Sequence, residues 1–271
     1  MASPSGHLLV MGGGDDHSAT SSAIRTFVKL AGAAADPHIV LLTTATRYPH
    51  DAYTKYADLF RRYGVPRVTA LGPITSAEAD DPSTVRVLQR ATAVLFTGGD
   101  QARIAALVGS KTNDVLKSRL RGDGLVVAGT SAGATAMGCT MIVGGGGYSI
   151  TPEAVHTGPG LALLPDVLVD MHFTERGRFQ RLLSAVALEP TQLGVGIDED
   201  TAVLVKDDLF EVLGTGAVTV LDARAASVVS RPTERHQLAF ADLRLHLLRP
   251  GCLFDLSLRR VVAGPWDRQE S

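Results

Sequence analysis

The sequence predicts an α/β fold in which helices cover both faces of a mainly parallel sheet. The 271 residues are 45% hydrophobic with a mean hydropathy of +0.14, which is enough to bury a sizeable core. Through the first half of the chain, short apolar runs alternate with longer stretches of helical spacing. Nearer the end, short β-rich runs follow one another directly. The first pattern favours βαβ units, and the second favours an antiparallel hairpin added to the parallel sheet.

The expected elements follow in chain order. Buried strands are predicted for the apolar runs at 7–11, 38–43, 67–71, 93–97 and 125–128. Helices are predicted for 19–31, 53–63, 82–91, 102–107 and 113–121. The β-rich runs are 195–197, 201–206, 209–213 and 217–221. Beyond residue 231 only 237–248 shows any periodicity, and no linker or repeat divides the chain, so we expect one domain over 1–271.

Composition limits the classes of partner. Lys and Arg total 26 against 28 Asp and Glu, and a formal charge of −2 offers no electrostatic case for binding nucleic acid or anionic lipid. The first seven residues lack the features of a leader, and no apolar run reaches the roughly 18 to 20 residues of a membrane span. Cys139 and Cys252 have neither metal-ligand nor redox spacing, which favours reduced thiols. We therefore expect a cytoplasmic protein.

The strongest local motif is a nucleophile elbow at 124–138, where a buried strand leads through Gly-Thr-Ser-Ala-Gly into a helix start of small residues. A serine on such a strand-to-helix turn is exposed and strained, and small neighbours prevent collisions with the backbone. Ser131 is the predicted nucleophile. The N–H of Ala132 can hold the oxyanion, and Gly98 or Gly99 could supply a second amide, with Gly99 preferred.

A serine nucleophile needs a base that a third group orients. Among eight histidines, His172 is the candidate, because it ends an apolar run, follows Asp170 closely and precedes three arginines. The other seven are expected to be ordinary structural or exposed residues: His7, His17, His38, His50, His156, His236 and His246. The orienting acid is expected from the carboxylates at 198–200, which directly follow an apolar strand, and their pattern does not choose among them.

Three arginines follow His172 closely. Arg178 and Arg181 share a helix face at i, i+3, whereas Arg176 lies off it, and such spacing is usually an ordinary charged surface. Should all three converge near His172, they would form clamps for substrate carboxylates, a task that suits arginine better than lysine. That second interpretation predicts an acidic group in the substrate.

Taken together, these motifs resemble the cyanophycinases, serine peptidases related to peptidase E that share the flavodoxin-like three-layer frame of class I glutamine amidotransferases. The matching segments run in family order: 12–16, 96–101, 129–134, 170–173 with the three arginines, 196–202 and 216–222. The resemblance implies a triad of Ser131, His172 and Glu199. It implies substrate contacts from Gln101, Asp170, Arg176, Arg178 and Arg181. It also implies cleavage of cyanophycin into β-aspartyl-arginine dipeptides, no metal or organic cofactor, and a homodimer.

One residue departs from the family pattern. Cyanophycinases typically carry Asp-Gln-His-Phe where this chain has Met171 in place of the glutamine, and a thioether cannot make the hydrogen bonds of an amide. Losing such a partner costs a buried substrate group about 1 to 3 kcal/mol, enough to redirect substrate choice. A related peptidase that acts on another isoaspartyl or arginine-containing peptide, within a biosynthetic pathway, is therefore the alternative.

Rival classes of function fit less well. A dinucleotide fingerprint starting at Gly12 would need a third glycine at position 17, which is histidine, and Asp15 and Asp16 would repel a pyrophosphate. A glutamine amidotransferase would need cysteine at the elbow, where this chain has Ser131. A non-catalytic scaffold is disfavoured because candidates for nucleophile, base and acid are all present.

Overall fold

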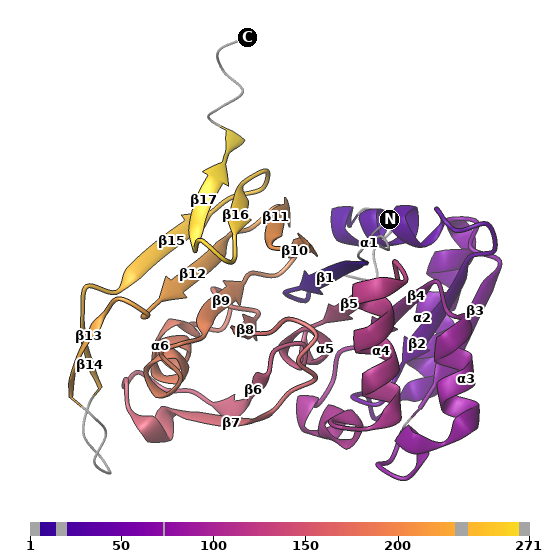
Figure 1. Ribbon diagram of the computed structural model, residues 1–271, viewed down its shortest axis with the longest axis horizontal. Coiled ribbons are helices and arrows are strands. Elements are labelled where there is room, and N and C mark those ends of the chain that lie inside the picture. Colours follow the sequence, from indigo (N-terminus) through magenta and orange to yellow (C-terminus); the bar gives the residue numbers. More distant parts are fainter. Residues whose placement is uncertain (1–5, 15–20, 73, 231–237, 266–271) are drawn as a thin grey trace.

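The computed structural model describes residues 6–14, 21–72, 74–230 and 238–265. Its centre is a nine-stranded sheet in the order β17-β16-β11-β10-β1-β5-β4-β2-β3 (Figure 1). The strands from β1 to β3 in this order are all parallel. Their bounds are β1 His7–Met11, β2 His38–Leu42, β3 Arg67–Leu71, β4 Ala93–Phe96 and β5 Val126–Thr130. The predicted parallel sheet is confirmed.

Apolar residues on these strands pack into two separate hydrophobic cores, one on each face of the sheet. Along β1, Leu8 and Val10 belong to one buried cluster, and Leu9 and Met11 belong to the other, because successive side chains of a strand point to opposite faces. Helices α1 and α2 contribute to the second cluster, and α3 and α4 to the first. The helix bounds are α1 Ser22–Ala31, α2 Pro49–Arg62, α3 Pro82–Arg90 and α4 Lys111–Gly122. This gives the expected three layers.

Some helix boundaries differ from the prediction. Helix α2 begins at Pro49 rather than at residue 53, since proline is favoured in a first turn, where no intrahelical partner is needed for its nitrogen. The segment predicted as a helix at 102–107 is a 3-10 helix, Gln101–Leu107. The helix predicted to begin at residue 19 starts at Ser22 in the part that the structure covers, and positions 19 and 20 lie outside the described residues.

The predicted hairpin is confirmed. Strands β10 (Thr201–Lys206) and β11 (Leu209–Gly214) are antiparallel, and β10 also pairs with β1 in antiparallel register. Strands β16 (Leu253–Asp255) and β17 (Arg260–Ala263) extend the sheet beyond β11. The antiparallel strands therefore continue the sheet on the side of β1.

A second sheet was not predicted. Strands β8 (Val167–Met171) and β9 (Leu193–Ile197) are parallel, and β12 (Val218–Asp222) and β15 (Arg244–Leu248) complete the order β15-β12-β9-β8 (Figure 1). The chain leaves this sheet in the turn at 198–200 and returns to it between β11 and β12. The runs at 195–197 and 217–221 thus belong to this sheet. The remaining elements are α5 Ala132–Thr135, β6 Thr140–Gly145, β7 Val155–Pro159, α6 Phe179–Leu188, β13 Ser227–Ser230, β14 Ala239–Ala241, and 3-10 turns at Glu78–Asp80 and Pro152–Ala154.

Two findings bear on the expected environment of the chain. None of the helices among the described residues is long and apolar enough to cross a lipid bilayer. Both cysteines are free thiols, with Cys252 buried and Cys139 exposed.

Candidate active site

Ser131 occupies the sharp turn between β5 and α5. Its φ of 51° and ψ of −112° are unusual for a residue with a side chain, and the Ser131 N–H donates to the Met11 carbonyl at 3.1 Å. The flanking glycines are required by packing: a β-carbon at position 129 would lie 2.5 Å from the Gly133 carbonyl oxygen, and one at position 133 would lie 2.6 Å from that of Phe96. Steric crowding at the elbow thus accounts for the small residues in the motif.

His172 comes from the second sheet, one residue beyond β8. Its Nε2 lies 2.8 Å from Ser131 Oγ, and its Nδ1 lies 2.5 Å from Glu199 Oε1. The His172 φ is 48°, and its backbone N–H donates to the Gly12 carbonyl at 2.9 Å. A β-carbon at Gly13, whose φ is 106°, would lie 2.2 Å from the His172 ring. The glycine-rich turn, which does not match a dinucleotide fingerprint, therefore packs against the imidazole.

The three carboxylates at 198–200 have different surroundings. Asp198 is buried and accepts hydrogen bonds from the Thr174 N–H at 3.1 Å, the Thr174 hydroxyl at 2.6 Å and the Ala217 N–H at 3.0 Å. The Asp200 N–H donates to the Gly13 carbonyl at 3.0 Å. Asp198 therefore ties the turn to its neighbours, and Glu199 is the carboxylate that reaches His172.

Sequence reasoning did not identify Glu175. Its Oε1 accepts a hydrogen bond from the Glu199 backbone N–H at 3.1 Å, so it helps to hold the turn that carries Glu199. An acidic residue three positions after His172 gave no signal of its own, because its partner lies on a distant part of the chain.

Burial lowers the pKa of His172 below its ordinary value, and the positive charges of Arg176 and Arg178 lower it further. The hydrogen bond that the His172 ring donates to the Glu199 carboxylate raises this pKa but does not reverse the shift. The imidazole is therefore neutral at neutral pH. A neutral His172 can accept the Ser131 proton.

Two loops offer backbone amides near Ser131. Ala132 is the first residue of α5, so its N–H has no acceptor within that helix. On the loop after β4, a β-carbon at Gly98 would lie 3.4 Å from Ser131 Cβ, whereas one at Gly99 would lie 2.3 Å from the Ala45 carbonyl oxygen. Gly98 thus faces the serine and Gly99 packs on the neighbouring loop. The choice of Gly99 as oxyanion donor stays a prediction.

The arginines surround a buried carboxylate. Asp170 is fully buried, and Arg181 binds it with two donors, Nε at 2.8 Å and a terminal nitrogen. Arg178 approaches Asp170 at 3.4 Å, and its pKa is lowered to about 10 by burial, so it is charged at neutral pH. Arg176 is exposed. Direct contact with a substrate is therefore closed to Asp170 in this structure and nearly so to Arg181, which is only 6% exposed. Arg176 presents its positive charge to the surface, whereas the Arg178 side chain is 13% exposed.

Met171 is also largely withdrawn from the surface. It is 4% exposed, and both its carbonyl oxygen and its sulfur accept hydrogen bonds from Arg178. The side chain at position 171 thus contacts an arginine of the cluster. Gln101, the other predicted contact, is half-buried, and its amide donates to the Ile142 carbonyl at 2.9 Å.

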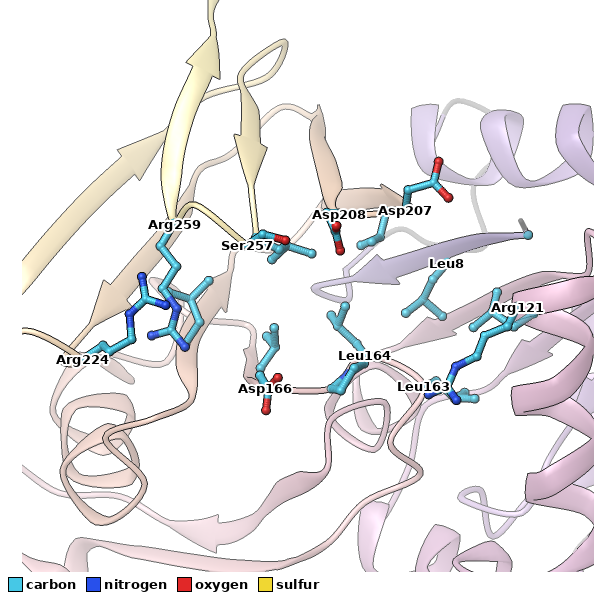
Figure 2. A pocket seen from close by; sticks show the side chains of 17 residues that line it. Leu8, Arg121, Leu163, Leu164, Asp166, Asp207, Asp208, Arg224, Ser257 and Arg259 are labelled. Carbon is cyan, nitrogen blue, oxygen red and sulfur yellow. The ribbon is translucent and has the colours of Figure 1, made fainter. Parts of the chain in front are cut away.

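A cavity lies at the other end of the sheet. It measures about 510 Å³, and leucines such as Leu8 and Leu164 line it together with charged residues such as Asp166 and Arg224 (Figure 2). It opens at the amino ends of the parallel strands, whereas Ser131 follows the carboxyl end of β5. Among the described residues, no cluster of histidine, cysteine, aspartate or glutamate side chains could hold a metal ion.

Comparisons with known proteins agree with this architecture. The cyanophycinase of Trichormus variabilis is 39% identical over 261 residues, covering 94% of this chain and 87% of the relative. That of Geminocystis herdmanii is 34% identical, covering 95% and 96% respectively. The crystal structure of a peptidase from an acI-B1 Actinobacterium superposes with a TM-score of 0.64 at 22% identity, covering 82% of this chain and 93% of that one, which supports the fold.

The family model of peptidase family S51 matches residues 8–213, which include the elbow, the second sheet's first strands and the turn between the sheets. Together with the relatives, this match confirms the resemblance predicted from the motifs. The chain belongs to peptidase family S51 and is a serine-type peptidase.

Proposed function

We propose that this peptidase cleaves β-aspartyl-arginine peptides such as cyanophycin, with Ser131, His172 and Glu199 as its triad. The observation that carries the proposal is the continuous line of hydrogen bonds from Ser131 Oγ through the imidazole to Glu199 Oε1, at 2.8 and 2.5 Å. Support for the substrate comes from the cyanophycinases at 34 to 39% identity. Family and geometry thus favour the same chemistry.

The proposed reaction is acyl transfer. His172 Nε2 accepts the proton of Ser131 while Oγ attacks the scissile carbonyl, and Glu199 stabilises the imidazolium that forms. The N–H of Ala132, with that of Gly99 as the second donor, holds the oxyanion. His172 then gives its proton to the leaving amine. A water molecule, deprotonated by the same imidazole, releases the acyl group and restores the serine.

The arginine cluster supplies the proposed recognition of aspartyl carboxylates. Arg176 carries positive charge at the surface beside His172, and Arg178, whose side chain is 13% exposed, adds a second charge there. Together they can hold a carboxylate and bring the carbonyl close to attack geometry. Asp170, itself bound by Arg181, positions Arg178 from below the surface. Gln101 is proposed to contact substrate through the part of its amide that Ile142 leaves unused.

A second candidate substrate follows from Met171. Because its sulfur and carbonyl both accept hydrogen bonds from Arg178, this residue influences how one clamp is held, and neither of these contacts involves a triad side chain. A peptidase with the same mechanism but a preference for another isoaspartyl or arginine-containing peptide, in a biosynthetic pathway, is the alternative.

The test is incubation of the purified enzyme with cyanophycin, with β-aspartyl-arginine oligomers and with a panel of other isoaspartyl peptides, followed by mass spectrometry of the products. We expect β-aspartyl-arginine products from the wild type and none from Ser131→Ala. Cleavage of the panel peptides alone would favour the alternative substrate. Undiminished cleavage by Ser131→Ala would remove the proposed mechanism.

A further inference from the structure

A groove adjoins the candidate active site on the side of the loop after β4. It measures about 300 Å³ and reaches from Thr97 and Gly98 to the start of α2, where Tyr48, Asp51 and Lys55 line it. Gly98, at one end of this groove, borders the nucleophile, because a β-carbon at Gly98 would lie 3.4 Å from Ser131 Cβ. A substrate group in the groove could therefore reach the reacting carbonyl by passing over Gly98.

The far end of the groove carries opposite charges that are unused within the protein. Asp51 and Lys55 are exposed and lie one helical turn apart, about 5 to 6 Å between their β-carbons. Among the described residues, neither side chain takes part in a hydrogen bond or an ion pair. The groove thus offers both an acceptor for a cation and a partner for an anion.

Tyr48 adds an aromatic surface to these charges. It directly precedes α2 and is 70% exposed, unusually open for so large a side chain. An exposed tyrosine ring beside a carboxylate suits a planar guanidinium, which can stack on the ring while donating to the carboxylate. The groove therefore selects for an arginine side chain over a compact ammonium.

We propose that this groove binds the arginine unit of the substrate, with Asp51 accepting from the guanidinium, Tyr48 stacking on it and Lys55 pairing with the free carboxylate. An arginine joined through its α-amino group to an aspartyl side chain keeps both its guanidinium and its α-carboxylate, so it matches both charges of the groove. The inference rests on the proposed function and deepens it. Arg176 and Arg178 would hold the aspartyl part, and this groove the arginine part.

The experiment compares ligands that differ in a single charge, using calorimetric binding to the Ser131→Ala protein so that no ligand is consumed. The probes are β-aspartyl-arginine, β-aspartyl-citrulline, which replaces the guanidinium by a neutral group of similar shape, and β-aspartyl-agmatine, which lacks the carboxylate. We expect the arginine probe to bind about fivefold more tightly than either of the others, as for an exposed ion pair.

Variants assign each preference to a residue. Asp51→Asn should abolish the preference for arginine over citrulline and leave the preference over agmatine, and Lys55→Gln should do the reverse. Tyr48→Ala should weaken the binding of β-aspartyl-arginine about threefold. The matched control is Asp58→Asn, which lies on the same helix and pairs with Arg61 instead of lining the groove. It should retain both preferences. All four positions are exposed, and unchanged thermal unfolding midpoints will show that the variants fold.

A full arginine preference in Asp51→Asn would overturn the inference, as would equal binding of all three probes or no binding of any. These outcomes are separate from the fate of the proposed function, because hydrolysis by the wild type is measured independently. Cleavage of arginine and citrulline peptides at equal rates would keep the function and remove the groove's role. Charge-dependent binding without any hydrolysis would support the groove as an arginine site and remove the proposed function.

Discussion

Replacing Gly13 with alanine is expected to disable the candidate active site while Ser131, His172 and Glu199 all keep their identity. A β-carbon at this position would lie 2.2 Å from His172 Cε1, 2.7 Å from Nε2 and 2.8 Å from Nδ1. Since carbon atoms pack at about 3.5 Å or more, the ring must move by more than about 1 Å. The Ser131–His172 hydrogen bond, now 2.8 Å, would then approach the distance of about 3.6 Å at which it ceases to exist.

A misplacement of about 1 Å costs catalysis on the order of 100-fold. The assay should not depend on the identity of the substrate, so we suggest the rate at which a fluorophosphonate reagent acylates Ser131. We expect Gly13→Ala to slow this rate by about 100-fold. Its free energy of unfolding should fall by about 1 to 2 kcal/mol, because an L-residue is strained at the Gly13 φ of 106°.

Gly64→Ala is the matched control. Gly64 also has a positive φ, 78°, but a β-carbon there would meet no atom within 4 Å. This variant should therefore lose similar stability while Ser131 reacts at the wild-type rate. Equal labelling rates for Gly13→Ala and wild type would refute the steric reasoning, and so would an equal fall in labelling rate in Gly13→Ala and Gly64→Ala.

Three further predictions concern other parts of the site. Because burial lowers the pKa of His172 and the reaction needs the neutral ring, the labelling rate should reach half its maximum below pH 6.5. Arg176→Gln removes a charge that lowers this pKa, so the midpoint should move upward. An unchanged pH profile would contradict the assignment of His172 as the base. Asp170→Asn leaves the buried charge of the Arg181 guanidinium uncompensated, so the free energy of unfolding should fall by about 3 to 5 kcal/mol in urea titrations. A loss under about 1 kcal/mol would show that this ion pair is unimportant for stability. Met171→Gln replaces a sulfur contact to Arg178 with an amide, so KM for aspartyl peptides should change while kcat stays within about twofold. A large fall in kcat would show that this residue affects the chemical step.

The local sequence was sufficient for features that depend on near neighbours. The apolar run of β1 is buried on both faces, with successive side chains in opposite cores, and such runs predicted the parallel strands and the helices between them. The elbow around Ser131 was also identified, because the small residues that its backbone needs lie within two positions of the serine. In such segments, steric constraints act between atoms that the chain itself holds together.

Features made by distant segments were decided only by tertiary structure. His172 lies 41 residues from Ser131 and 27 from Glu199, and the three meet because the chain leaves one sheet and enters the other in the turn at 198–200. Motif order alone supplied the choice of Glu199, and nothing in the sequence distinguished its exposure from the burial of Asp198. The sequence pattern identified the arginines as a group of charges near His172. Which of them is buried depends on how the two sheets pack, and only the tertiary structure placed Arg181 inside and Arg176 outside.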